Sequence, residues 1–290
     1  MTVRAQTSPM SVMRKALTSA IAAVALLLSL TAPAGAITGG LPDGNLHPNV
    51  GLILYYTEEG RFRCSATLIS PTVLLTAAHC TEGTLGSTLV TFDSVIAENP
   101  PSPFPVAADP SAGYTPQEIT AAGFLSGTAH THPEYSGFTD LDNWNDIGVI
   151  VLDQPVAGIT PAQLAPIGYL DAYAQPRLNK TIFTFVGYGT EVRKPLTGPQ
   201  KPQPMTYPLM RRYAESPGQK LTPQILQANG NYNDNRGTGG TCFGDSGGPG
   251  FLNGYLVTVT SYGYTQNCRY LGGYQRVDIP VVADWIATFL

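Results

Sequence analysis

An all-β fold is predicted by the composition and the hydrophobic patterning of this 290-residue chain. It contains 31 glycines and 25 prolines, and only 12% of its residues are charged, roughly half the usual share of about 25%. So many turn-forming residues argue against a helical bundle, and a hydrophobic content of 43% argues against disorder. Short runs rich in Val, Ile, Thr, Tyr and Phe lie between the turns, as in proteins built from short strands.

The first 36 residues are predicted to be a secretory signal peptide. Arg14 and Lys15 precede the apolar run 21–30, and the small residues at 34–36 provide the pattern that signal peptidase cleaves. The run is short for a membrane span, which needs about 20 apolar residues, and an N-terminal anchor is the alternative. We expect a secreted, extracellular protein with no membrane association after cleavage.

The charge balance argues against a nucleic-acid partner. The chain has 16 Lys and Arg against 20 Asp and Glu. Three of the bases, Arg4, Arg14 and Lys15, lie in the signal segment, which has no acid. The mature chain is therefore more acidic than the formal net charge of −4, and no stripe of positive charge is available for nucleic acid.

The four cysteines of an exported chain favour two disulfides, for which three pairings exist. They fall as two pairs that are local in sequence, Cys64 with Cys80 and Cys242 with Cys268, and this pairing is the simplest. A zinc site is the competing interpretation because His79 adjoins Cys80, although no CxxC or HxxxH spacing supports it. We expect two disulfides and no metal.

Two proline-rich stretches divide the predicted strands. The stretches 99–116 and 194–223 carry six and seven prolines. Because proline cannot donate to a central ladder, both are predicted to be loops or edge connections. Only 281–290 is predicted to be a helix, since its apolar residues share one face. The predicted strands are Leu52–Tyr56, Ala66–Ile69 with Val73–Thr76, Thr88–Phe92, Ile147–Leu152, Ile182–Val186 and Tyr255–Thr260.

Ser246 is the candidate nucleophile, in the segment GDSGGP at 244–249. Glycines around a serine let the backbone turn sharply and leave amide N–H groups free to point at one spot. The segment also matches the GxSxG elbow of α/β-hydrolases, in which the histidine follows the serine. All four histidines here precede Ser246, at positions 47, 79, 130 and 132. The remaining orders are His, Asp, Ser and Asp, His, Ser.

The base and its orienting acid are predicted at His79 and Asp146. His79 lies in TAAHC at 76–80, at the end of an apolar strand and beside a candidate disulfide, which limits its rotation. Asp146 opens an apolar strand in NDIGV, so it should be largely buried, as an orienting partner for imidazole must be. Each residue alone could be a core histidine, a strand cap or a turn serine. Their combination predicts acyl transfer.

With these motifs the chain resembles the chymotrypsin family of trypsin-like serine proteases over nearly all of 37–290. The resemblance implies two packed antiparallel six-stranded β-barrels and a C-terminal helix. The first barrel would be 37–163, with the proline-rich insertion 99–116, and the second 164–290. The matching motifs are TAAHC at 76–80, DIGVIVL at 146–152 and CFGDSGGP at 242–249, supported by GYG at 187–189, SYG at 261–263 and GGYQRV at 272–277.

The resemblance also assigns catalytic roles by position. Ser246 would attack the scissile carbonyl, His79 would take and return the proton, and Asp146 would hold the imidazole. The backbone N–H groups of Gly244 and Ser246 would form the oxyanion hole.

The primary specificity pocket is expected to be open and uncharged. By its position in the family motif, Gly240 would lie at the base of the pocket, with Ser261, Gly263 and Gly272 along its walls. Glycines at these positions leave room for a large side chain and provide no carboxylate for Arg or Lys. The resemblance therefore implies a preference for large apolar or aromatic residues before the cleaved bond.

The sequence ITGG at 37–40 is similar to the activated N-terminus of this family. In such proteases the freed amino group pairs with the acid before the serine, here Asp245. Because Ile37 directly follows the small residues at 34–36, we expect signal peptidase itself to expose it.

These observations predict a secreted serine endopeptidase, with two rivals: an esterase that uses the same triad, and a catalytically silent binding homologue. No cofactor and no metal are expected. The expected partners are polypeptide substrates and protein protease inhibitors, and the chain is expected to be a monomer.

Overall fold

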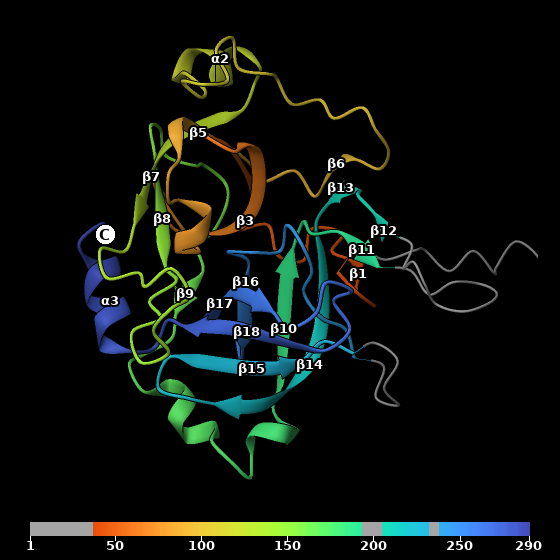
Figure 1. Ribbon diagram of the computed structural model, residues 1–290, viewed down its shortest axis with the longest axis vertical. Helices are drawn as coiled ribbons and strands as arrows, with labels where there is room; N and C mark the ends of the chain where they lie inside the picture. Colours follow the sequence, from red (N-terminus) through yellow and green to blue (C-terminus); the bar gives the residue numbers. More distant parts are fainter. Residues whose placement is uncertain (1–36, 193–204, 232–237) are drawn as a thin grey trace, which may run out of the picture. The chain divides into compact units, whose positions relative to one another are not determined.

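The first barrel consists of β2 (Val50–Thr57), β3 (Gly60–Ser70), β4 (Val73–Thr76), β5 (Leu85–Thr91), β7 (Leu125–Thr131) and β8 (Gly148–Leu152). The computed structural model describes residues 37–192, 205–231 and 238–290 (Figure 1). The strands close in the order β2-β3-β4-β8-β7-β5, and every neighbouring pair is antiparallel. All residues of β2 except the last are buried, which explains its continuous apolar sequence.

The second barrel consists of β10 (Ile182–Gly187), β14 (Arg212–Leu221), β15 (Ile225–Asn229), β16 (Pro249–Leu252), β17 (Tyr255–Gly263) and β18 (Leu271–Arg276). They follow the order β14-β10-β16-β17-β18-β15, and β15 pairs back with β14. These pairs are antiparallel too. The prediction of two six-stranded barrels is confirmed.

Short elements join the barrels and extend their edges. The strand β1 (Leu41–Pro42) pairs with β14, so the first residues that the structure describes join the second barrel and not, as expected, the first. The strand β9 (Gln163–Leu164) runs parallel to β17. The other short elements are β6 (Val95–Ala97) with β13 (Leu209–Met210), β11 (Glu191–Val192) with β12 (Met205–Thr206), and the 3-10 helices η1 (Ala78–Cys80), η2 (Tyr169–Tyr173) and η3 (Leu178–Lys180).

One apolar core crosses from the first barrel to the second. Ile53 and Leu75 of the first barrel share a buried cluster with Leu256 and Val259 of β17. Burial of each such side chain contributes roughly 1.5–3 kcal/mol. The two barrels are therefore packed on each other through their cores, and the loops at this junction are fixed by both.

The predicted strands are all present. Residues 194–204 lie outside the described part of the chain, and for the rest of 194–223 the prediction of loops or edge connections is wrong at β14. Within that stretch β14 lies inside the second barrel although it contains Pro217. On one side Pro217 pairs with Ile182 of β10. On the other side β15 joins β14 only from Gly218 onward, so the missing N–H of Pro217 falls where the strand has a locally free edge.

The insertion 99–116 is irregular and leads into a helix that the sequence prediction missed, α2 (Pro116–Ala121). Thr115 and Glu118 form a capping box at its start, and the pattern Thr-x-x-Glu could have revealed it. Tyr114 is 1% exposed and meets Tyr56 edge to face at 4.9 Å. The insertion is thereby packed onto the first barrel.

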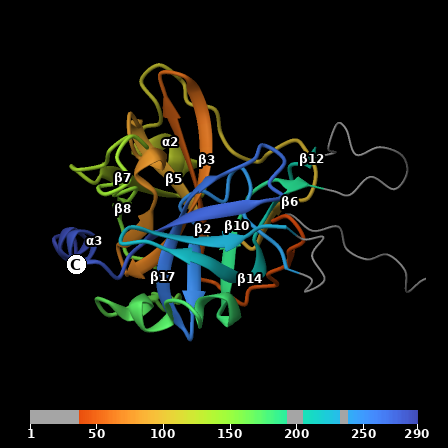
Figure 2. The same ribbon diagram turned by 60° about the horizontal axis from the view of Figure 1, so that its bottom comes forward.

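The C-terminal helix α3 (Pro280–Ala287) confirms the predicted helix, shortened at its end. Val282 and Ile286 are buried in the core that crosses the barrels, and Trp285 packs against His132, which follows β7, at 4.9 Å. Both ribbon views show α3 beside β7 and β8 (Figure 2). Among the described residues, no helix has the length and apolar character needed to cross a membrane.

Candidate active site

His79 lies in η1, the short 3-10 turn that follows the buried strand β4. Its neighbour Cys80 is bonded to Cys64 of β3, and the second disulfide joins Cys242 to Cys268. Both predicted disulfides are confirmed. The sulfurs of Cys64 and Cys80 lie near the His79 ring, but because they are bonded to each other they cannot serve as thiolate ligands for zinc.

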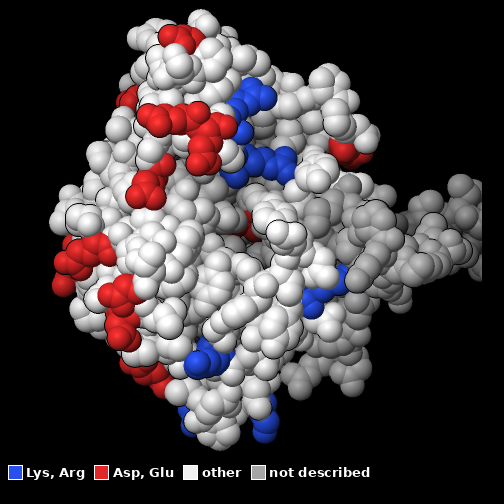
Figure 3. Space-filling model, in the orientation of Figure 1, with Lys and Arg blue, Asp and Glu red and all other residues white. Residues whose placement is uncertain are grey.

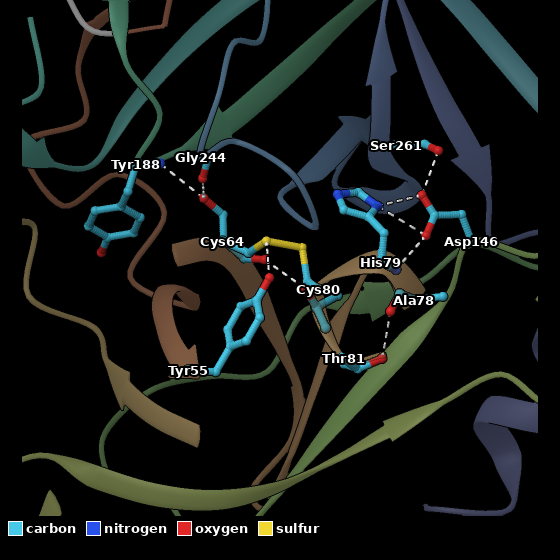
Figure 4. The surroundings of a disulfide bond; sticks show 12 residues. Tyr55, Cys64, Ala78, His79, Cys80, Thr81, Asp146, Tyr188, Gly244 and Ser261 are labelled. Atoms are coloured by element: carbon cyan, nitrogen blue, oxygen red, sulfur yellow. Dashed lines mark hydrogen bonds and ion pairs between the residues drawn. A yellow bond between two sulfur atoms is a disulfide. The ribbon is translucent and has the colours of Figure 1, made fainter. Parts of the chain in front are cut away.

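Asp146 holds the imidazole of His79 from a fully buried position (Figure 4). The His79 Nδ1 lies 2.9 Å from Asp146 Oδ2, and the His79 backbone N–H donates to Oδ1 at 3.0 Å. The hydroxyl of Ser261 donates to Oδ2 at 2.6 Å. This arrangement favours the tautomer with the proton on Nδ1 and leaves Nε2 free to accept one.

Two residues that the sequence analysis did not single out complete this network. The indole N–H of Trp144 donates to Ser261 Oγ at 2.9 Å, and the backbone N–H of Asp146 donates to Gln275 Oε1 at 3.1 Å. Ser261 and Gln275 belong to the second barrel, whereas Asp146 precedes β8 of the first. No local sequence signal connects these residues, which lie more than 100 positions apart.

Ser246 lies at the tip of a turn that only glycines permit. Gly244 and Gly247 have φ values of +94° and +78°, and a Cβ on Gly247 would lie 2.0 Å from Thr76 Oγ1. The Ser246 carbonyl accepts a hydrogen bond from Ser65 N at 2.8 Å. Ser246 and His79 line the same hollow. Within the described chain no hydrogen bond joins their side chains, a contact that often tightens only when substrate binds.

The N–H groups of Gly244 and Ser246 are free and fixed in direction. Thr190 N donates to the Phe243 carbonyl at 2.7 Å, and Gly248 N donates to the Asp245 carbonyl at 2.9 Å. In a trans peptide the N–H points opposite to its carbonyl, so these bonds orient the N–H groups of the next residues. Neither N–H has a protein acceptor in the described part of the chain, as an oxyanion hole requires.

Asp245 is a buried carboxyl group without a counter-ion among the residues that the structure describes. It accepts hydrogen bonds from Gly189 N at 2.7 Å and Cys242 N at 2.8 Å. Burial nevertheless raises its pKa to about 7, although these two bonds and the nearby Arg63 oppose the rise.

Ile37 is buried beside the same part of the second barrel. It is 0% exposed, and Gly240 N donates to the carbonyl of Thr38 at 3.0 Å. Its φ is +56°, which strains a β-branched residue. No hydrogen bond or ion pair joins Ile37 to Asp245 within the described residues.

A cavity of about 270 Å³ adjoins Ser246 and contains Ser261, Gly263 and Gly272 in its lining. Gly240, predicted at the base, is not part of this lining. It packs against Gly230 so closely that a Cβ on Gly240 would lie 2.3 Å from the Gly230 Cα, and Gly230 is among the lining residues. No charged side chain is among the described lining residues, which include Thr241, Phe243, Tyr262, Tyr264, Tyr270 and Leu271.

Several known proteins are similar to this chain in sequence or in fold. The sequence model of the trypsin family matches residues 49–286. A trypsin from Saccharopolyspora erythraea is 28% identical over 242 residues, 78% of this chain and 86% of that protein. Brachyurin from Leptuca pugilator is 29% identical over 233 residues, 79% of this chain and 88% of that protein.

Two solved structures share the fold. HL collagenase superposes with a TM-score of 0.58 at 18% identity, covering 88% of this chain and 96% of its own. A mutant of human heparin binding protein gives 0.56 at 17% identity, covering 87% and 96%. At such identities the likeness shows the fold alone. The family match extends over most of the chain, and this protein therefore belongs to the trypsin family of serine proteases.

Proposed function

We propose that this chain is a secreted serine endopeptidase that acts through Ser246, His79 and Asp146. The observation that carries the proposal is the buried Asp146 carboxylate, which holds His79 Nδ1 at 2.9 Å beside a hollow that also exposes Ser246. A histidine that served only packing would not need an orienting carboxylate with two further donors.

The geometry supports the following sequence of steps. Ser246 Oγ attacks the scissile carbonyl while His79 Nε2 accepts its proton, and the resulting imidazolium is stabilised by Asp146. The oxyanion takes hydrogen bonds from the N–H groups of Gly244 and Ser246; loss of one such donor typically costs about 3 kcal/mol. His79 then protonates the leaving amine, and water releases the acyl group from Ser246 by the reverse proton transfers.

Activation depends on a free Ile37 amino group. Ile37 is already buried. Among the described residues Asp245 has no ion-pair partner, and the nearby charge of Arg63 only partly opposes the rise of its pKa. Cleavage before Ile37 would convert the amide nitrogen into an ammonium and would remove the constraint that the preceding peptide bond places on φ. Sequencing the N-terminus of secreted material tests this step, and an N-terminus at Gly35 or earlier in active enzyme contradicts it.

The pocket beside Ser246 supports a preference for large apolar or aromatic residues before the cleaved bond. Its described lining is uncharged and rich in tyrosine, and a Cβ on Gly263 would meet nothing within 4 Å. A peptide-library cleavage profile tests this preference. Cleavage chiefly after Arg, Lys or an acidic residue would contradict it.

Replacement of Ser246 by Ala is the decisive test of the activity itself. We expect Ser246→Ala to abolish peptide cleavage while leaving the fold intact, and a phosphonyl fluoride to label wild type at Ser246 only. Absence of labelling in correctly processed protein would indicate the silent binding homologue. Hydrolysis of short-chain esters without cleavage of proteins would indicate the esterase.

A further inference from the structure

Arg63 is a cationic side chain beside the candidate oxyanion hole that no described residue engages. It lies on β3 directly before Cys64 and is partly buried. A Cβ on Gly244 would lie 3.1 Å from Arg63 Nε. No hydrogen bond or ion pair to its guanidinium is present in the described part of the chain. Burial lowers the pKa of Arg63, and the charge of Asp245 partly opposes this.

Arg63 stands where two hollows meet. The hollow that contains His79 and Ser246 shares Arg61, Phe62, Arg63 and Tyr207 with a second cavity of about 280 Å³. The proline-rich insertion forms one wall of this second cavity through Pro100, Ser102 and Phe104.

Arg61 fixes that wall in place. Its Nη1 donates to the carbonyl of Pro105 at 2.9 Å, and Tyr114 Oη donates to the same carbonyl at 2.6 Å. Arg61 and Arg63 are two positions apart on β3 and therefore point to the same face of the strand. Arg61 is occupied in holding the insertion, whereas Arg63 remains available.

The path of a bound peptide brings the residues after the scissile bond to Arg63. The cavity beside Ser246 and the hollow that contains His79 share Phe243 and Ser246 in their linings, whereas Cys64, His79 and Arg63 line only the hollow. If the side chain before the bond enters the cavity, the chain after the bond continues over the hollow. The first residue after the bond lies beside His79, which protonates its nitrogen, and the next lies about 3.5 Å farther along an extended chain.

We propose that Arg63 binds the carboxylate of an Asp or Glu that occupies the second position after the scissile bond. The substrates of this site are then peptides that are acidic at that position, and the inference rests on the proposed endopeptidase function. A planar guanidinium donates two parallel hydrogen bonds to a carboxylate. Because Arg63 is partly withdrawn from water already, it gives up little further hydration when it binds one.

Neighbouring acids do not occupy this role. Asp245 is fully buried, and its carboxylate takes its hydrogen bonds from Gly189 and Cys242. Glu58, Glu59 and Glu82 line the same hollow, and none of them forms an ion pair with Arg63 in the part of the chain that the structure describes. Acidic and basic groups lie next to each other on the upper part of the face in Figure 3, so this surface is divided by charge and not uniformly acidic.

The test compares two peptides that differ only in Glu or Gln at the second position after the scissile bond. Both carry Phe before the bond, and the enzyme is expressed from its full chain and titrated at its active serine. For wild type we expect kcat/KM to be about tenfold higher for the Glu peptide at low salt, with the ratio falling as salt screens the pair. In Arg63→Gln the ratio should fall to about one, and in Arg63→Glu a Lys peptide should become the preferred substrate.

Lys220→Gln is the matched control, because Lys220 is an exposed base on β14 outside the cleft. It should keep the wild-type ratio. A ratio near one in wild type overturns the inference, and so does a ratio that Arg63→Gln leaves unchanged. If Ser246 is not labelled and the enzyme cleaves neither peptide, the endopeptidase proposal fails, and so does this inference, which rests on it. Labelled enzyme that cuts both peptides equally refutes the role of Arg63 alone.

Discussion

Retention of residues before Ile37 should destabilise this protein at neutral pH, because the buried carboxyl group of Asp245 then has no ammonium to pair with. The comparison is between protein that begins at Ile37 and protein that keeps Gly35 and Ala36 ahead of it. In the extended form Asp245 is buried without an ion-pair partner among the described residues, and burial raises its pKa from 3.8 to about 7 although the nearby Arg63 opposes the rise. One pKa unit corresponds to about 1.4 kcal/mol, so the penalty above pH 7 is about 4 kcal/mol.

The sign follows from which state binds the proton more tightly. A carboxyl group with a raised folded-state pKa binds its proton more tightly when folded, so the free energy of unfolding falls as pH rises from about 4 to about 7. We expect the ammonium of the processed form to remove this loss by pairing with the carboxylate. Its own contribution is present below the unfolded amino pKa of about 7.7–8.0 and is lost as pH rises through the folded value.

Urea unfolding of both forms at pH 4.5, 6.0 and 7.5 measures the effect. The extended form should lose about 3 kcal/mol of stability across this range relative to the processed form, because part of the penalty is already present at pH 4.5. The control is Asp245→Asn. This change removes the buried carboxylate from the extended form and the ion pair from the processed form, so the two pH profiles of the free energy of unfolding should become parallel. Parallel profiles in the wild-type pair would refute the reasoning.

Three further changes test the site and the insertion. Ser261→Ala removes a hydrogen bond to Asp146. It should lower kcat about tenfold or more with little change in KM. An unchanged kcat would mean that Asp146 orients His79 without Ser261. Gly263→Val fills open space on the pocket wall. The ratio of kcat/KM for peptides with Phe to that for peptides with Ala before the scissile bond should therefore fall about tenfold or more. An unchanged ratio would exclude this cavity as the specificity pocket. Thr115→Ala removes the cap of α2 and should cost about 1 kcal/mol in urea unfolding, without changing turnover of small peptides.

Local sequence was sufficient wherever a feature depends on neighbours in the chain. The strand around Leu52–Tyr56 and the short disulfide loops followed from adjacent residues, and so did the GDSGGP turn. Features set by distant contacts were missed. The strand β14 contains a proline that is tolerated only because β15 joins the sheet one residue later. The pocket lining includes Gly230 and not Gly240, which packs against it.

The acid that orients His79 is itself held by the opposite barrel. Asp146 comes from the first barrel, yet Ser261 and Gln275 of the second barrel bind its carboxylate and its backbone N–H. A small slip between the barrels would break these bonds while leaving both sheets closed. We therefore expect catalytic activity to depend on the docking of the two barrels. With increasing denaturant concentration, activity should be lost before the strands unfold.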